Sequence, residues 1–388
     1  MIERLTPMMT SRDRILKALN HEEPDRLPLD LGSSFVTGIA RIAYTNLMKY
    51  LGKEIKIEFY DTLQQLVVVD DELLKELEVD VRGLIPNITR KNPEIEETGS
   101  TRVFTDEWGV RWEMPEGSLY FNLVKSPLAG EITEDDIDNF TFPDTDDPKL
   151  LDGLDVKAKK YYEDGYAVIL ESVCAGIFEM SCRIRGTQDF LMDLAVNPEL
   201  ACKLMDRLVE LKIQFYGMSS KQLGQYIQFI REGDDVAGQE TMMISMNMYR
   251  KLIKPRHEKL FKAQKEMFPQ PFYVFFHSDG QVYDLLNDFI EIGMDILNPV
   301  QVTGKSLDDI KREFGDRISF WGGGCDTQKV LPFGTPEEVK QDVEQRIESL
   351  SPNGGFIFCP VHNIQADVTP ENIMAMYETL SQMMKTNG

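Results

Sequence analysis

Short runs of apolar residues alternate with amphipathic helical stretches along most of this chain. Eight of these runs are rich in β-branched and aromatic residues and end in polar or glycine residues, which is typical of buried parallel strands. From residue 167 onward, helical segments with clear start signals separate most of the runs. The predicted strands are Arg26–Leu31, Val79–Ile85, Ala167–Glu171, Tyr226–Arg231, Phe272–Phe276, Ile296–Val300, Ile318–Trp321 and Phe356–Phe358.

Capping residues mark where several helices begin. Thr10 and Asp13 have the spacing of a capping box, and they predict a first helix over 11–21 that Pro24 stops. Ser, Thr and Asn are favoured as caps because their side chains accept a hydrogen bond from the unpaired backbone amides of the first turn. Further helices are predicted to follow Asn197, Thr335 and Thr369, each of which precedes proline and glutamate.

Eight strands alternating with helices predict an α/β fold, a (β/α)8 TIM barrel, formed by residues 1–388 as a single domain. A doubly wound open sheet is the alternative. It is less favoured because no glycine-rich dinucleotide loop follows any strand. The segment Gly322-Gly323-Gly324 lacks the GxGxxG spacing and is followed by Cys325.

One stretch does not fit a plain barrel. Residues 101–124 alternate between polar and apolar positions like antiparallel strands, with turn residues at 115–117. An acidic run follows over 131–149. We interpret residues 95–150 as an insertion, consisting of a β-hairpin and an acidic loop. Two roles are open for it, a cover over the barrel mouth or a surface decoration.

The composition restricts the partners and the compartment. Lys and Arg number 42 against 65 Asp and Glu, a net charge of −23, which repels nucleic acid. No signal peptide and no apolar run near membrane-spanning length is present, so no membrane association is expected. Five cysteines without a CxxC pair predict a reducing, cytoplasmic setting. If the chain associates, a homodimer is the commonest closed assembly.

Function in a barrel lies at the carboxyl ends of the strands. The residues at those ends are rich in metal-ligand side chains. They are Asp30, Gly32, Glu171, Asp234, Asp235, His277, Asp279, Gln301, Cys325, Asp326, Cys359 and His362.

The motif FFHSDG contains the strongest metal-ligand candidates. It places His277 and Asp279 two positions apart, so both side chains point to the same side of an extended chain. Cys325 and Cys359 end two later strands. Thiolate, imidazole and carboxylate together favour Zn²⁺ over Mg²⁺ or Ca²⁺. The alternative is that the histidine is satisfied by ordinary hydrogen bonds and that the buried thiols are inert.

Other strand-end residues are candidates for catalysis and for substrate binding. Asp234, beside Asp235, has the chemistry of a general base or of a partner to a histidine ligand. Glu171 is the second candidate catalytic carboxylate. A solvated charge pair is the alternative for Asp234 and Asp235. The candidate substrate-binding residues are Asp30, Gln301, His362 and Asn363.

Several motifs resemble the uroporphyrinogen decarboxylase-like superfamily over essentially the whole chain. They are HSDG, GGGCDTQKVLPFGTPEEV, PVHNIQADVTPENI, REGDDVAGQ followed by a helix ending KLIKPRHEKL, and the opening SRDRILKALNHEEPDRLPLDLG. The resemblance implies a (β/α)8 barrel and one of two chemistries. One branch contains metal-free decarboxylases with an arginine-rich RQAGRY loop, where this chain has DRLPLDLG with only Arg26.

The second branch contains zinc-dependent methyltransferases that exchange methyl groups with a corrinoid protein through a His-x-Cys motif and a later Cys. His277 and Cys359 match this motif, Asp279 stands where the middle Cys is expected, and Cys325 is a further thiol. The resemblance leaves two ligand sets open. One is Asp279, Cys325 and Cys359, and the other is His277, Cys325 and Cys359.

The function implied is zinc-dependent transfer of a methyl group from a small donor, an aryl methyl ether by preference, to the cobalt of a corrinoid. An oxygen leaving group needs a Lewis acid, and an aspartate ligand makes zinc better suited to oxygen. The chain lacks a DxHxxG corrinoid motif, so the corrinoid is expected on a separate partner protein. Metal-free decarboxylation and a non-catalytic scaffold barrel are the alternatives.

Overall fold

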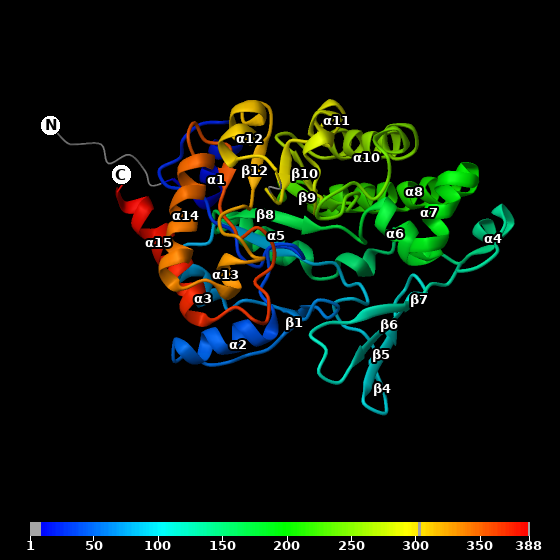
Figure 1. The fold of residues 1–388 in the computed structure, drawn as a ribbon, viewed down its shortest axis with the longest axis horizontal. Helices are drawn as coiled ribbons and strands as arrows, with labels where there is room; N and C mark the ends of the chain where they lie inside the picture. Colours follow the sequence, from blue (N-terminus) through cyan, green and yellow to red (C-terminus); the bar gives the residue numbers. More distant parts are fainter. Residues whose placement is uncertain (1–8, 302–303, 387–388) are drawn as a thin grey trace.

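The computed structural model describes residues 9–301 and 304–386. Seven parallel strands form one curved sheet in the order β13-β12-β11-β10-β9-β8-β3 (Figure 1). Each neighbouring pair in this order is parallel, as a barrel requires. The strands are β3 (Val81–Leu84), β8 (Ala167–Glu171), β9 (Phe229–Gly233), β10 (Tyr273–His277), β11 (Ile296–Asn298), β12 (Ser319–Trp321) and β13 (Phe356–Ile357).

The segment around Leu29 closes this sheet into a barrel. Leu29 forms a parallel bridge with Phe358, just beyond β13. Its carbonyl oxygen also accepts a hydrogen bond of 2.8 Å from the backbone amide of Asp80, just before β3. The segment therefore lies between the two edge strands, and the predicted (β/α)8 barrel is confirmed. The predicted strand Arg26–Leu31 is reduced to this single bridge.

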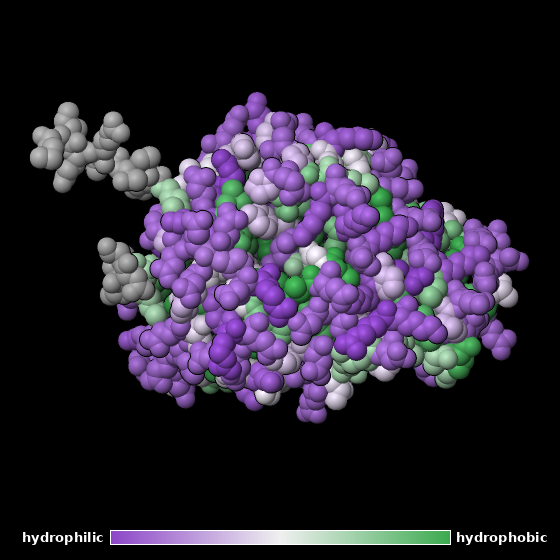
Figure 2. All heavy atoms as spheres, turned by 90° about the horizontal axis from the view of Figure 1, so that it is seen from above, coloured by the Kyte–Doolittle hydropathy of each residue, from purple (hydrophilic) through white to green (hydrophobic). Residues whose placement is uncertain are grey.

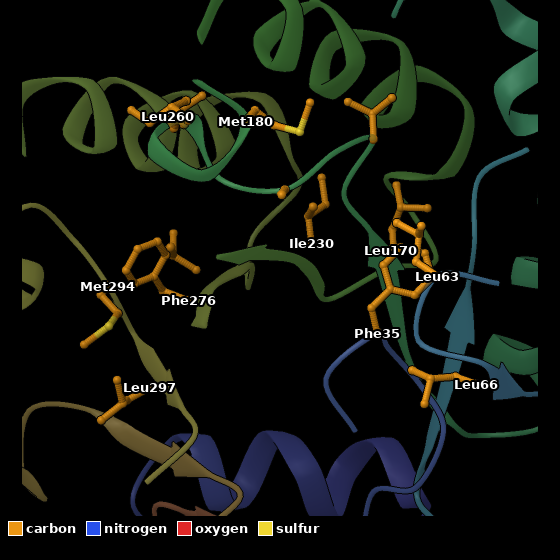
Figure 3. Packing of buried hydrophobic residues seen from close by; sticks show 14 of the residues in the cluster. Phe35, Leu63, Leu66, Leu170, Met180, Ile230, Leu260, Phe276, Met294 and Leu297 are labelled. Carbon is orange, nitrogen blue, oxygen red and sulfur yellow. The ribbon is translucent and has the colours of Figure 1, made fainter. Parts of the chain in front are cut away.

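Side chains alternate between the interior of the barrel and its outer face. Phe229, Phe275 and Trp321 belong to an interior cluster. Their neighbours Ile230 and Phe276 belong to a second cluster formed with the surrounding helices (Figure 3). This is the period-2 alternation of strands that are buried on both faces, and it explains why the strands read as continuous apolar runs.

The first helix closes the amino-terminal end of the barrel. Helix α1 (Ser11–Leu19) is capped by Thr10, whose hydroxyl accepts from the backbone amide of Asp13. Its residues Ile15 and Leu19 pack in the interior cluster. The helix ends two residues earlier than predicted, because His21 has a φ of 56°, which an α-helix does not accommodate. Only the carboxyl-terminal end of the barrel remains for a site.

Helices surround the sheet (Figure 1). The predicted starts are confirmed, with Asn197 capping α8 and a capping box of Thr335 and Glu338 opening α14. The outer helices are α2 (Arg41–Tyr50), α3 (Asp71–Glu76), α5 (Leu154–Glu163), α6 (Ile177–Arg185), α7 (Thr187–Val196), α8 (Pro198–Leu223), α9 (Met246–Met248), α10 (Lys254–Met267), α11 (Leu286–Glu291), α12 (Leu307–Phe314), α13 (Val330–Phe333), α14 (Pro336–Leu350) and α15 (Pro370–Thr386), with single turns at Pro148–Leu151, Tyr249–Ile253 and Tyr283–Leu285.

The insertion between β3 and β8 is larger than the single hairpin predicted. Its strands form a four-stranded antiparallel sheet in the order β4-β5-β6-β7. The outer strands β4 and β7 are exposed throughout, so no burial pattern marks them in the sequence. The acidic run contains one short helix. The bounds are β4 (Glu96–Thr98), β5 (Thr101–Thr105), β6 (Arg111–Pro115), β7 (Asn122–Lys125) and α4 (Glu134–Asn139), and a separate small ribbon is formed by β1 (Phe59–Asp61) and β2 (Leu66–Val67).

The surface is predominantly polar. Figure 2 shows a face on which hydrophilic side chains cover most of the area and hydrophobic ones appear in small areas. Within the described residues, no helix combines the length and the apolar character needed to cross a membrane.

Barrel closure supplies a stability prediction. Asp80 is fully buried and pairs with Arg14 at 2.6 Å and with Arg26 at 2.8 Å. Asp80→Ala removes the buried partner of Arg26 and leaves Arg14 paired with Asp25 alone. We therefore expect a loss of about 3–5 kcal/mol in the free energy of unfolding. Urea denaturation measures this loss. The matched control is Asp164→Ala, which breaks an exposed pair with Lys160 and is expected to cost less than about 1 kcal/mol. An equal effect of both substitutions contradicts the prediction.

Candidate active site

A cavity of about 310 Å³ lies at the carboxyl-terminal end of the barrel. Its polar wall comes from the end of β10, which supplies His277, and from the loops after β9, β10 and β13, which supply Asp235, Asp279 and His362. Its apolar wall includes Phe35 and, from the insertion, Trp112, Tyr120 and Phe121. The insertion therefore covers part of the barrel mouth, which decides between the two roles left open for it.

Three residues of the polar wall form a group suited to a metal ion. The ligand atoms of His277, Asp279 and His362 all lie within 4.8 Å of one another. His277 Nε2 is 3.8 Å from Asp279 Oδ1, and His362 Nε2 is 3.5 Å from Asp279 Oδ2. Donors about 2.0–2.1 Å from a tetrahedral zinc lie about 3.4 Å apart, so small side-chain shifts bring these atoms to that geometry.

A hydrogen bond fixes the orientation of His277. Its Nδ1 lies 2.6 Å from Asn298 Oδ1. The amide nitrogen of Asn298 donates to the carbonyl oxygen of Trp321, so the oxygen of that amide must face the imidazole. His277 therefore donates from Nδ1 and presents an unprotonated Nε2 to the cavity. Metal-binding histidines are commonly held this way.

Electrostatics also favours a cation at this group. Burial lowers the pKa of His277, which keeps its imidazole neutral. Burial, together with the nearby carboxylates of Glu179 and Asp279, raises the pKa of Asp235 well above its usual range. Asp235 Oδ1 accepts a hydrogen bond from the backbone amide of Asp279 and lies 3.8 Å from His277 Nε2. Carboxylates crowded around neutral imidazoles are stabilised by a positive ion.

Neither predicted cysteine ligand lies in this group. Cys359 belongs with Ile357 to the interior cluster, because residues two apart on a strand point to the same side. Cys325 packs against the outer helices and faces Asp342 of α14. Burial raises the pKa of both thiols. His362, which is a predicted substrate-binding residue, lines the cavity from the loop after β13.

The carboxylate of Asp234 does not line the cavity. It accepts hydrogen bonds from the backbone amides of Phe178 and Glu179 at 2.8 and 2.9 Å, at the start of α6, and lies 2.9 Å from His257 Nε2. Asp234 is therefore a positioning residue that holds the amino terminus of α6. The neighbouring Asp235 takes the cavity position that the sequence analysis gave to Asp234.

Glu171 also lies behind the cavity wall. Its carboxylate accepts from the backbone amide of Phe35 at 2.9 Å and pairs with Arg231 through Nε at 2.5 Å. Phe35 and Arg231 line the cavity, whereas Glu171 does not. Glu171 thus orients two wall residues and does not itself face a ligand.

Asp30 is buried inside the barrel, away from the predicted substrate contact. It accepts hydrogen bonds from Ser33 Oγ at 2.7 Å and from the indole of Trp321 at 3.0 Å. Burial raises the pKa of Asp30 to about 6. Its hydrogen bonds tie the loop after the closing segment to β12.

Gln301 and Asn363 support the cavity from outside. Gln301 accepts from the backbone amide of Gly280, which follows Asp279, at 2.8 Å. Asn363 accepts from the amide of Gly38 at 2.6 Å and donates to the carbonyl oxygen of Phe35 at 2.9 Å. Both residues position cavity segments, and neither lines the cavity as predicted.

Sequence reasoning missed three arginines in the cavity wall, Arg90, Arg183 and Arg231. They lie far apart in the chain, so no local motif joins them. Arg231 belongs to the motif REGDDVAGQ, in which the site prediction used only the carboxylates. The chain lacks the arginine-rich loop of the decarboxylase branch, yet the wall of its cavity contains these three arginines. Only the closed barrel brings the three side chains to one cavity.

Comparison with known proteins places this geometry in a family. The family model for uroporphyrinogen decarboxylase matches residues 106–383, more than half of the chain. The uroporphyrinogen decarboxylase of Pseudoalteromonas translucida is 33% identical over 67 residues, which cover 17% of this chain and 18% of that protein. The chain thus matches less than a fifth of the length of this curated relative.

A solved structure shares the fold across nearly the full length. A methyltransferase from Methanosarcina mazei superposes with a TM-score of 0.66 at 17% sequence identity, covering 97% of this chain and 99% of the other. At this identity the likeness concerns the fold alone. The family match and the closed barrel together lead to one conclusion: the chain belongs to the uroporphyrinogen decarboxylase family.

Proposed function

We propose that this protein is a zinc-dependent methyltransferase that moves a methyl group from a small donor to the cobalt of a separate corrinoid protein. The observation that carries the proposal is the group of His277, Asp279 and His362 in the wall of an aromatic-lined cavity. The fold shared with a protein described as a methyltransferase agrees with it.

The donor set fits zinc in a catalytic setting. Two imidazoles and one carboxylate are the three protein ligands found in several catalytic zinc sites, which leave a fourth position open. A zinc ion bound there supplies Lewis acidity, which stabilises an oxygen leaving group when a methyl ether is cleaved. Asn298 keeps His277 Nε2 available, and Gln301 holds the loop that carries Asp279.

The cavity wall accounts for the rest of the proposed reaction. Phe35, Trp112 and Phe121 enclose an apolar space beside the metal group, which suits an aryl methyl ether. The corrinoid is expected on a partner, because the chain lacks a corrinoid-binding motif. Tyr120 is half exposed and Leu119 is similarly exposed, so the insertion presents apolar side chains next to the mouth where a partner docks.

A second candidate is metal-free decarboxylation of a carboxylate substrate. The observation that favours it is the presence of Arg90, Arg183 and Arg231 in the cavity wall. The short match to a uroporphyrinogen decarboxylase agrees with this candidate. Metal content separates the two functions.

The ligand set is tested by zinc content. We expect about one zinc per chain in the parent protein, and a loss in His277→Ala and His362→Ala because each removes one of three ligands. Cys359→Ser is the control and is expected to retain the metal. Mass spectrometry of metals after purification without added zinc measures this. Zinc retained by His362→Ala and lost by Cys359→Ser supports the cysteine ligand sets instead. No zinc in the parent protein supports decarboxylation.

Asp235→Asn tests the charge of the site. In the metal-free protein, an ionised Asp235 is destabilising at neutral pH because its folded pKa lies above its unfolded value. At pH 7, the free energy of unfolding of the variant is expected to exceed that of the parent protein by up to about 1 kcal/mol. This advantage should shrink as the pH falls through the folded pKa toward 4, because the parent carboxyl then takes up its proton. Urea denaturation at several pH values measures both effects, and a variant less stable at pH 7 contradicts the prediction.

Methyl transfer is tested directly with cob(I)alamin as the acceptor. The zinc-loaded protein is expected to form methylcobalamin from an aryl methyl ether, followed by its absorption spectrum. His277→Ala should slow this reaction by at least about 100-fold, since replacing even a residue that only supports a metal ligand costs about 10–100-fold. Cys202→Ser on α8 is the control and should leave the rate unchanged. Formation of methylcobalamin at equal rates with and without the protein contradicts the proposed function.

A further inference from the structure

We propose that the methyl donor is a small aromatic acid, whose carboxylate is bound by the arginines of the cavity wall while its methoxy group faces the metal group. This inference rests on the proposed function and adds the charge of the substrate to it. Its basis is a set of three cavity arginines with remaining donors that no described residue accepts from.

Arg90 is anchored on one edge only. Its Nε and Nη2 donate to the two oxygens of Asp61 at 2.6 and 2.5 Å, and Asp61 is fully buried. Its Nη1 forms no hydrogen bond with any residue that the structure describes. The guanidinium lies 4.3 Å from the centre of the Phe35 ring, which faces the cavity. A fixed guanidinium with a free edge is suited to binding an oxyanion.

Arg231 is anchored in the same manner. Its Nε and Nη2 pair with the buried carboxylate of Glu171, and no described residue accepts from its Nη1. A Cβ atom added to Gly233 would lie 3.0 Å from this Nη1 and 2.8 Å from His277 Cβ. The free donor of Arg231 is therefore close to the metal group, and the glycine leaves room for it.

Arg183 is the most adaptable of the three arginines. One nitrogen donates to Glu179 at 3.1 Å, while Nε and Nη1 have no partner within the described part of the chain. Its guanidinium lies 5.7 Å from the centre of the Trp112 ring of the insertion. Its side chain is 24% exposed, so it contacts both cavity and solvent. It is the arginine that can move toward an entering carboxylate.

The cavity wall restricts the charge, the shape and the size of the ligand that fits it. Asp61 and Glu171 lie behind their arginines, so the donors face the cavity and the carboxylates do not. The guanidinium groups of Arg90 and Arg231 both lie near the ring of Phe35, at 4.3 and 6.0 Å from its centre. An aromatic acid matches such a wall with its ring and its carboxylate. A cavity of about 310 Å³ is at the small end of ligand sites and suits one ring.

The arginines of the cavity wall also offset the repulsion between the acidic protein and an anionic substrate. The chain has a net charge of −23, so its overall field repels an anionic substrate. Anchored guanidinium groups inside a partly enclosed cavity attract the carboxylate at short range, where screening by salt is weaker. A neutral methyl ether would leave these donors without a partner, which disfavours its binding.

The test compares an acid with its neutral isostere. Titration calorimetry on the zinc-loaded protein, without corrinoid, measures binding of 2-, 3- and 4-methoxybenzoate and of the corresponding methoxybenzamides. We expect at least one acid to bind about 10-fold more tightly than its amide, as a charge-assisted hydrogen bond to arginine requires. Arg183→Met should weaken binding of that acid about 10-fold and leave the amide within about 2-fold. Arg183→Lys should restore most of the preference.

Controls separate folding from recognition. Arg207→Met removes the same charge from α8, where Arg207 pairs with exposed Glu210 outside the cavity, and is expected to change neither affinity. If Arg183→Met has no effect, the double variant Arg90→Met, Asp61→Asn removes an anchored pair without leaving a buried charge. Equal affinity for acid and amide, no binding of any acid, or unchanged preference in both variants overturns the inference.

The inference and the proposed function fail in different ways. If methyl transfer from neutral ethers is as fast as from acids, the proposed methyltransferase activity stands and the inferred negative charge of the substrate is wrong. If the acids bind tightly through the arginines but no methyl transfer occurs, the inferred negative charge of the substrate is supported and the proposed methyltransferase activity is wrong.

Discussion

Closure of the sheet at Leu29 is the constraint on which the whole site depends. Leu29 accepts a hydrogen bond from Asp80 just before β3, and its neighbours Pro28 and Asp30 exchange hydrogen bonds with Phe358 just beyond β13, so the strand ends converge on one mouth. Asp80 stabilises this closure by pairing with Arg14 and Arg26 under the barrel, on the side opposite the cavity. The family's fold is therefore held by charges at one end and used for chemistry at the other, as is general for such barrels.

Buried carboxylates in this protein act mainly through the groups they orient. Glu171 holds Arg231, Asp61 holds Arg90, and Asp234 caps α6 and contacts His257. Removing such a carboxylate from water costs free energy unless a cation or several amides bind it. Each of these carboxylates is therefore bound to its partner within the protein and is not available to a ligand. The groups left free to meet a ligand are the arginine edges and the less enclosed Asp235 and Asp279.

The mouth brings together side chains of two kinds. His277, Asp279 and His362 offer nitrogen and oxygen donors, and the arginines and their aromatic neighbours line the same cavity. Groups suited to a cation and groups suited to an anion therefore share one cavity. Which residues occupy the strand ends decides the chemistry, because the barrel beneath them is unchanged.

The sequence by itself determined the barrel, seven of its eight predicted strands, the caps of α1, α8 and α14, and the proximity of His277 to Asp279. These follow from period-2 patterns and capping chemistry, which are local. Only the tertiary structure placed His362 beside His277 and Asp279, turned Asp234 away from the cavity, and brought the three arginines together. Those outcomes have two causes. One is the direction in which each side chain points at the end of its strand, and the other is contact between segments that are far apart in sequence. Local spacing along the chain encodes neither of them.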